Sequence, residues 1–324
     1  MRKLTNLINL GVLSIFTLLI VWLAFFDGVQ KTQDWWWLRS YEPSSEIEQL
    51  ASDSSFSDKG RDIFYISDPQ LQGQAEFNDS CDIAEISIIL GCYSNRKIYV
   101  YNVDDPRIAD VEEVTAAHEL LHAVYERLSS DEIDKINGLL DQELKSLSDQ
   151  RLLDLIELYS ERDASLLSNE LHSIFGTELA KISTELEEHY SVYFTDRSNV
   201  VAKAQTYATT FLDITSQLED YDAQLTSLSS EIDNEKQKSS DLKKELDESD
   251  DKLDELLNSS ELEDYNAQVS KHNELVNEYN NSLSATDALI NNYNQLARER
   301  NALAYDQRSL IESIDSSPDR VIEL

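Results

Sequence analysis

Proline and glycine are scarce in this sequence, and their distribution divides the chain into two regions. The 324 residues include 4 prolines and 7 glycines, and no proline occurs between Pro106 and Pro318. Gly138 and Gly176 are the only glycines in that interval. Because proline and glycine are the residues that most often end helices, we predict that this interval is almost wholly helical.

Basic residues are also scarce. There are 27 Lys and Arg residues against 63 Asp and Glu residues, which gives a formal net charge of −36 at pH 7. A chain of this charge repels the phosphates of nucleic acids, so we expect no nucleic-acid partner. The length leaves room for one or two domains with a core of ordinary size.

A long apolar segment lies close to the N-terminus. Residues 4–26 contain no charged side chain and would span roughly 34 Å as a helix, enough for a bilayer core of ~30 Å. Arg2 and Lys3 precede the segment and Asp27 follows it, and no small-residue cleavage site ends it. The sequence therefore predicts a single-pass membrane anchor with a cytoplasmic N-terminus and an extracytoplasmic remainder. Residues 35–37 are three tryptophans, which favour the membrane interface, with a patch in the protein core as the alternative.

Cysteine is limited to Cys81 and Cys92. Both residues follow the predicted anchor, on the side of the membrane where disulfides persist. Their spacing matches no common zinc-ligand motif. We therefore predict a disulfide that contributes ~3 kcal/mol, with two free thiols as the alternative.

Short β-branched and aromatic runs predict a small β-sheet before the helical interval. These runs are residues 63–66, 86–90 and 97–103. The segment 44–59 before them is polar and rich in serine, which is typical of a linker.

A helix that carries a candidate site is predicted to begin at Val111. Asp110 and Glu113 form a capping-box pattern at its start. The helix contains the sequence Thr115-Ala-Ala-His-Glu-Leu-Leu-His-Ala-Val124. Further helices are predicted at residues 131–147, 152–161 and 164–189.

His118 and His122 are one helical turn apart, so both rings could bind one metal ion. Glu119 lies beside them, where a general base could act on a water molecule held by the ion without occupying a ligand position. The alternative is a chance motif on a buried helix, because only three positions of the pattern are fixed.

A catalytic zinc ion needs a third protein ligand. The helical neighbours of Glu170 are Leu166, Leu167, Ser173 and Ile174, so its carboxylate stands in an otherwise largely apolar stripe. An uncompensated charge there is costly, and metal coordination or a buried ion pair would relieve that cost. The other carboxylates that could serve as the third ligand are Glu157, Glu161 and Glu178.

The helix motif resembles that of the zincin metallopeptidases. Tyr125 and Leu128 stand where a metzincin would have glycine and histidine, which excludes that branch. The segment Asn169-Glu-Leu-His-Ser-Ile-Phe-Gly-Thr177 resembles the second zinc motif of thermolysin-like gluzincins. It departs from that motif by one missing residue before Ile174 and by the absence of an aspartate four residues after the ligand. The resemblance implies Zn²⁺ as cofactor and Glu170 as the third ligand.

A zinc peptidase also needs a hydrogen-bond donor for the oxyanion that forms on the substrate carbonyl. The nearest candidates along the chain are His189, Tyr190, Tyr193 and Arg197. Surface packing is the alternative role for each of them. The strand predicted at residues 97–103 is expected to hold an extended peptide by edge pairing.

Residues 200–314 predict an antiparallel coiled-coil hairpin. Apolar residues recur at alternating spacings of four and three from Val200 onward, and a second series begins at Leu262. The two arms have nearly equal lengths, which favours folding back over the alternative of one long helix in an intermolecular coil. His272 lies in the seam, so we interpret it as a packing residue. Polar seam positions weaken the pairing locally at Glu235, Ser239 and Ser249.

These features predict an α+β, mostly helical protein. Its predicted parts are an anchor at 1–27, a juxtamembrane linker at 28–60, a zincin-like domain at 61–198, a coiled-coil hairpin at 199–316 and a tail at 317–324. The expected function is a membrane-anchored, extracytoplasmic, zinc-dependent endopeptidase that acts on a peptide or protein substrate, with a protein partner on the coiled-coil arm. The alternative is a non-catalytic, zinc-containing scaffold or adaptor at the cell envelope.

Overall fold

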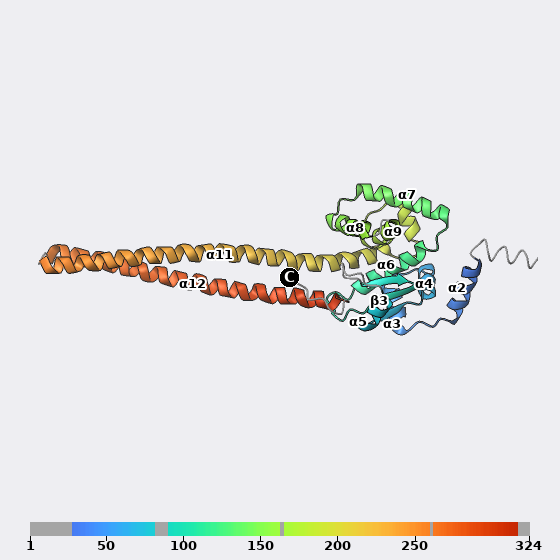
Figure 1. Ribbon diagram of the computed structural model, residues 1–324, viewed down its shortest axis with the longest axis horizontal. Coiled ribbons are helices and arrows are strands. Elements are labelled where there is room, and N and C mark those ends of the chain that lie inside the picture. Colours follow the sequence, from blue (N-terminus) through green and yellow to red (C-terminus); the bar gives the residue numbers. More distant parts are fainter. Residues whose placement is uncertain (1–27, 82–89, 163–164, 260–261, 317–324) are drawn as a thin grey trace, which may run out of the picture. The chain divides into compact units, whose positions relative to one another are not determined.

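A computed structural model describes residues 28–81, 90–162, 165–259 and 262–316 (Figure 1). The described chain is mostly helical, with one three-stranded sheet and two long C-terminal helices, which confirms the predicted fold class at this level. The predicted anchor at 1–27 lies outside these residues. Among the described helices, none is both long and apolar enough to cross a membrane.

The chain divides into two compact units. The first contains the residues up to Ala208 together with those from Ser313 onward, and the second is Thr209–Glu312. This division falls at 208/209, ten residues after the boundary that the sequence predicts at 198/199. Val200, where the predicted seam begins, has 0% exposure and belongs to the core of the first unit. The apolar spacing runs without a break through both units because one continuous helix connects them.

The sheet contains β1 (Gln70–Gln72), β2 (Gly91–Ser94) and β3 (Lys97–Tyr101) in the order β1-β3-β2. β1 is parallel to β3, and β2 is antiparallel to it. Ile98 and Val100 of β3 are fully buried. The strand predicted at 97–103 is thus confirmed over most of its length.

The run at 63–66, which we predicted to be a strand, is helical. It belongs to α4 (Asp58–Ile66), and the side chain of Ser57 caps this helix by accepting a hydrogen bond from the Gly60 N–H. Gly60, Ile63 and Phe64 form its buried face at helical spacing. The run predicted at 86–90 lies outside the described residues except for Leu90.

The segment 44–59, predicted to be a linker, packs into the core instead. Most of it forms α3 (Ser45–Asp53), which begins at the N-cap Ser44. The helix buries Ile47, Leu50 and Ala51, and these residues belong to the main hydrophobic cluster. Ile47 and Leu50 are three residues apart and Ala51 follows directly, so the three side chains share one face of a helix although the segment is rich in serine. The preceding helix, α2 (Gly28–Ser40), also occupies part of the predicted linker.

The central helix of the first unit is α6 (Val111–Tyr125). In Figure 1 the sheet, α3 and α5 (Gln74–Ser80) lie on one side of α6. On its other side lie α7 (Ser130–Ser146), α8 (Gln150–Arg162) and α9 (Leu167–Glu178). α6 is therefore covered from both sides, and Ala116, Leu120, Leu121 and Ala123 have 0% exposure.

The predicted capping box at the start of α6 does not form. Asp110 has helical backbone angles and makes no side-chain cap. Its carboxylate lies 3.4 Å from Nζ of Lys203, and the carboxylate of Glu113 lies 2.9 Å from the same atom. Both acids therefore pair with a lysine that is distant in the sequence.

The single helix predicted at 164–189 is two helices, α9 and α10 (Thr184–Tyr190). Leu179 is extended and ends α9. Side chains from elsewhere satisfy the backbone groups at the break, because Nη1 of Arg197 donates to the Leu179 carbonyl at 2.8 Å and the Ser183 N–H donates to the Glu143 carboxylate at 2.6 Å. These partners lie at distant positions, which explains why local sequence did not reveal the break.

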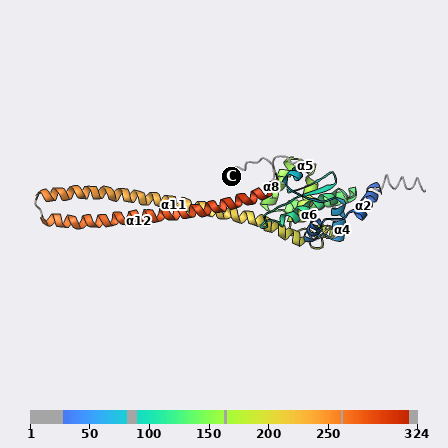
Figure 2. The ribbon, with the colours of Figure 1, turned by 90° about the horizontal axis from the view of Figure 1, so that it is seen from below.

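The second unit consists of parts of α11 (Arg197–Ser259) and α12 (Leu262–Ile314). The two helices lie side by side in both views (Figure 1, Figure 2). Hydrogen bonds connect Thr215 to Gln307, Asp222 to Arg300, Ser239 to Ser282 and Ser249 to Gln268. Residues later in α11 bond to residues earlier in α12, so the two helices are antiparallel.

Buried polar residues bridge the two helices where the predicted seam is interrupted. Ser239 and Ser282 are buried, and their hydroxyl oxygens are 2.7 Å apart. The Ser282 hydroxyl also donates to Glu235 at 2.7 Å. Nδ1 of His272 lies 3.3 Å from the hydroxyl of Ser249, so this histidine contacts the facing helix.

Candidate metal centre

Three potential metal ligands converge from two helices. α6 provides His118 and His122, and α9, which packs against it, provides Glu170. Oε2 of Glu170 lies 3.6 Å from Nε2 of His118 and 3.7 Å from Nε2 of His122. One donor atom from each residue lies within 4.8 Å of the other two, and no second such cluster occurs among the described residues.

The spacing of these atoms fits a single zinc ion. Zinc bonds of ~2.0–2.2 Å in a tetrahedral site place two ligand atoms ~3.3–3.6 Å apart, close to the two separations from Glu170, while all three atoms lie within 4.8 Å of one another. Two imidazoles and one carboxylate are also the donor set of many catalytic zinc sites. The chain can therefore offer three ligands that need little movement to meet one ion.

The surroundings of the two histidines perturb their pKa values in opposite directions. Burial lowers the pKa of His122 to about 4, and the neighbouring His118 contributes to this lowering. Burial also acts to lower the pKa of His118, but the nearby carboxylates, above all Glu170, outweigh it and raise that pKa. His122 is thus neutral, as a metal ligand must be, and the close pair that His118 forms with Glu170 at 3.6 Å is one that a cation would replace.

Glu119 lies beside the ligands, beneath strand β2. Its side chain is 5% exposed, and burial raises its pKa to about 8 despite the opposing effects of His118 and the Tyr93 backbone N–H. A Cβ atom added to Gly91 would lie 2.8 Å from Oε1 of Glu119. Only glycine therefore allows β2 to pass this close to the carboxylate.

A cavity of about 290 Å³ opens beside His118 and Glu119. Leu155 and Tyr159 of α8 and Tyr207 of α11 line it, together with the ion pair between Arg151 and Glu178. The two charges of that pair are 2.6 Å apart, so Glu178 binds Arg151 rather than completing the ligand set. Glu157 and Glu161 are exposed on α8 and do not belong to the metal-ligand cluster.

Asn169 is a residue of the site that sequence reasoning missed. It directly precedes Glu170, and its side chain interacts with His122 in the direction that raises the pKa of the ring. An amide oxygen near a ligand histidine can fix the orientation and tautomer of the ring. The available signal in the sequence is the Asn-Glu pair, in which Asn169 directly precedes the candidate ligand.

The four residues predicted as oxyanion donors do not line this cavity. The Tyr190 hydroxyl donates to the His172 carbonyl at 2.8 Å, and Arg197 pairs with Glu187 at 2.6 Å. Nε2 of His189 lies 2.8 Å from Nε2 of the fully buried His172. Tyr193 borders a separate cavity with Glu132 and Arg127. Tyr190, Tyr193 and Arg197 are buried, so these three side chains pack in the interior and not on the surface.

The predicted edge pairing by the strand at 97–103 is also wrong. β3 is the central strand, paired with β1 on one side and β2 on the other. A central strand has no edge along which a peptide could add. β1 and β2 are the two edge strands, and β2 is the one whose Gly91 approaches Glu119.

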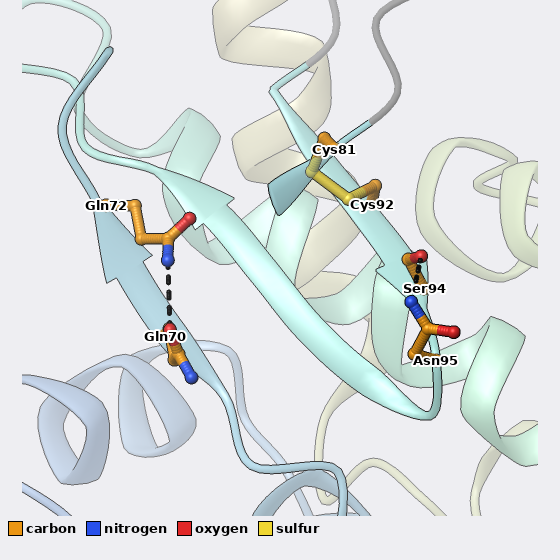
Figure 3. Close-up of a disulfide and its surroundings, with 6 residues drawn as sticks. All are labelled: Gln70, Gln72, Cys81, Cys92, Ser94 and Asn95. Atoms are coloured by element: carbon orange, nitrogen blue, oxygen red, sulfur yellow. Dashed lines mark hydrogen bonds between the residues drawn. A yellow bond between two sulfur atoms is a disulfide. The ribbon is translucent and has the colours of Figure 1, made fainter. Parts of the chain in front are cut away.

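The structure joins Cys81 to Cys92, with Cα atoms 6.0 Å apart (Figure 3). Cys81 follows the end of α5, and Cys92 lies in β2. The neighbours of Cys92 on either side, Gly91 and Tyr93, are the two residues that approach Glu119. The disulfide therefore ties α5 to the strand that covers the candidate general base.

The arrangement combines three ligands, one buried acid and an adjacent cavity, which are the elements of metal-assisted hydrolysis. Comparison with known proteins found no matching family model, no similar curated protein and no similar solved structure.

Proposed function

We propose that this chain is a membrane-anchored, zinc-dependent endopeptidase with a zincin-like, gluzincin-type site. The observation that carries the proposal is the convergence of His118, His122 and Glu170 beside Glu119 at the edge of a cavity. A structural zinc site usually has four protein ligands, whereas three ligands beside an acid are typical of a catalytic one.

Glu119 is the general base in this proposal. A zinc ion held by the three ligands would polarise a peptide carbonyl and make a water molecule more acidic. Glu119 accepts the proton of that water and later delivers it to the leaving amine. Its burial raises its pKa to about 8, which suits proton delivery, and a neighbouring cation favours the ionised form that accepts the proton.

Tyr159 and Tyr207 take the place of the four oxyanion candidates in the proposal. Both border the cavity that contains His118 and Glu119. A phenol is a suitable donor to an oxyanion. Tyr207 belongs to α11, the helix whose later residues form part of the second unit.

The proposed localisation rests on the apolar stretch near the N-terminus, and the proposed partner contact rests on the two long C-terminal helices. The proposed anchor is the apolar stretch at 4–26, which leaves the zinc domain on the extracytoplasmic side, and a disulfide is compatible with that side. The antiparallel helices of Thr209–Glu312 form a coiled-coil arm in this proposal, suited to recruit a substrate or a protein partner.

A non-catalytic zinc scaffold is the competing function. The observation in its favour is that Glu119 and His122 are 5% and 9% exposed, so little of the catalytic machinery is accessible. Peptide hydrolysis separates the two functions, because a scaffold would bind zinc but cleave nothing.

The test is cleavage of a broad peptide library by the purified, zinc-loaded full chain and by its Glu119→Gln variant. We expect the variant to keep its zinc and to lose hydrolysis by a factor on the order of 10²–10⁴, because it lacks the proton acceptor. The matched control is Glu157→Gln, which changes an exposed glutamate of α8 and should cleave as wild type does. Undiminished turnover in Glu119→Gln would remove the proposed base, and zinc-loaded wild type that cleaves no peptide would favour the scaffold.

A further inference from the structure

Helix α2 exposes tryptophan to solvent. Trp35, Trp36 and Trp37 have exposed fractions of 57%, 69% and 41%. The alternative of a tryptophan patch in the core is therefore wrong. Large aromatic side chains gathered at one exposed place are typical of a surface that contacts another partner.

α2 is nevertheless held firmly on the first unit. Nε1 of Trp37 donates to the Tyr65 carbonyl at 3.1 Å. The carboxylate of Asp34 lies 3.5 Å from Arg96 and 3.8 Å from Arg127. Trp35 and Trp36 are therefore presented by a helix with a defined position and are not part of a loose tail.

Two cavities border α2. One of about 580 Å³ is lined by Trp36, Trp37 and Ile66, among others. The other, of about 650 Å³, is lined by Trp35, Leu38 and Ile63 among others. The second cavity also contains charged side chains such as those of Lys59 and Asp62, so the exposed rings stand beside hollows of mixed polar and apolar lining.

We propose that α2 is a membrane-contact surface whose Trp35 and Trp36 insert among the headgroups of a zwitterionic lipid bilayer. The inference rests on the proposed anchor, because the apolar stretch ends at Phe26, two residues before α2 begins. Tryptophan prefers this interfacial depth, where its ring is apolar and its N–H can stay hydrated. The guanidinium of Arg39 lies 4.8 Å from the Trp35 ring and suits the phosphate level of the same surface.

The net charge of the chain indicates which type of bilayer the proposed surface would bind. A formal net charge of −36 repels an anionic membrane, so the affinity must come from the aromatic rings and not from a basic patch. The proposed surface also orients the metal domain, since Arg127, which pairs with Asp34, donates to the carbonyl of Ala123 in α6 at 2.7 Å. We therefore expect the site to act on polypeptide segments close to the membrane.

The experiment uses the full chain reconstituted into phosphatidylcholine vesicles that contain lipids brominated either near the headgroup or near the methyl end of the acyl chain. The chain has 4 tryptophans, so in the Trp22→Phe variant all tryptophan emission comes from α2. We expect bromine near the headgroup to quench that emission roughly twofold and bromine near the methyl end to quench it much less.

A second pair of variants links the quenching to the exposed rings. Trp35→Ser combined with Trp36→Ser, in the Trp22→Phe background, should abolish most of the quenching, whereas the matched control Val192→Ser, at an exposed apolar residue of the same unit, should leave it unchanged. Quenching of wild type but not of Trp22→Phe would overturn the proposed surface while the anchor stands. No quenching of either protein would overturn both the surface and the anchor.

Discussion

Glu119 illustrates how burial creates a potential general base and also makes it dependent on a cation. Its carboxyl is almost fully buried, and burial raises its pKa to about 8. At neutral pH the isolated group is therefore largely protonated and could not accept a proton. A positive charge held by His118, His122 and Glu170 would reverse this preference. In the proposed mechanism, metal binding and the base strength of Glu119 would therefore be coupled.

One prediction at the residue scale concerns the protonation of His189. Burial lowers its pKa in the folded state to about 4, whereas a histidine in an unfolded chain titrates near 6.5. The unfolded state therefore binds a proton first, and folding stability falls as the pH decreases from about 6.5 to about 4. In His189→Gln, we expect the metal-free protein to lose ~1–3 kcal/mol less stability over this range than wild type.

Urea unfolding of metal-free wild type and His189→Gln at pH 7.5 and at pH 4.5 measures this difference. Gln can still take part in the hydrogen bond to His172, so the variant removes the titration more than the packing. An identical pH dependence in the two proteins would show that His189 is not held neutral by its burial.

Site residues that share one face of a helix could be predicted from the sequence. Site residues that tertiary packing brings together could not. His118 and His122 share a helix turn, and Glu170 stands in an apolar stripe, so local periodicity identified all three. Tyr159 and Tyr207 reach the cavity from α8 and α11, which no local pattern connects to the histidines. The oxyanion candidates were selected by nearness along the chain, and that criterion does not predict nearness in space.

At the scale of elements, the close approach of β2 to α6 is the feature most sensitive to change. A Cβ atom at position 91 would meet Glu119 and the methyl group of Thr115. In Gly91→Ala we therefore expect Glu119 to be displaced and peptide hydrolysis to fall about 10²-fold, because a shift of about 1 Å in a catalytic group has effects of this size. Zinc content should not change, since Gly91 contacts none of the three ligands in this way.

Gly138→Ala is the matched control, because nothing lies within 4 Å of an added Cβ at that helical position. It should keep full activity and raise stability by ~0.5–1 kcal/mol. Peptide cleavage rates and zinc content of both variants provide the measurement. Wild-type activity in Gly91→Ala would show that β2 does not position Glu119.

Two helices were predicted incorrectly because the amino-acid composition of their segments indicated another structure than the spacing of their apolar residues. Ile47, Leu50 and Ala51 form a helical face, but the serine-rich sequence around them favoured a linker. The β-branched run at 63–66 favoured a strand, although Ser57 supplies an N-cap signal six residues earlier. The central place of β3 depends on β1, a strand of 3 residues whose parallel pairing has no local signature.

At the scale of the whole molecule, the division between the two units falls later than the heptad pattern indicates. Val200 and Ala204 are 0% and 4% exposed, and Tyr207 borders the cavity. The heptad spacing predicted the long helices, but it could not show where one helix passes from the core of one unit into another.

Replacing Thr209–Glu312 with a flexible Gly/Ser linker should therefore leave zinc content and small-peptide hydrolysis within about threefold of wild type, because none of the replaced residues lines the cavity or binds the metal. Removing residues 200–314 should instead destabilise the first unit, since it deletes Val200 and Ile314, which are 0% and 2% exposed. Zinc analysis, cleavage assays and thermal unfolding compare the two deletions. Loss of zinc from the shorter deletion would contradict the independence of the metal domain.

The metal content of the purified chain tests the central claim most directly. We expect wild type to carry about one zinc per chain, and Glu170→Ala to lose its zinc or bind it on the order of tenfold more weakly, because a ligand is removed. The control Glu178→Ala removes a glutamate that is paired with Arg151, and it should retain about one zinc. A wild-type chain that binds no zinc, or zinc that is lost from Glu178→Ala but kept by Glu170→Ala, would contradict the proposed metal centre.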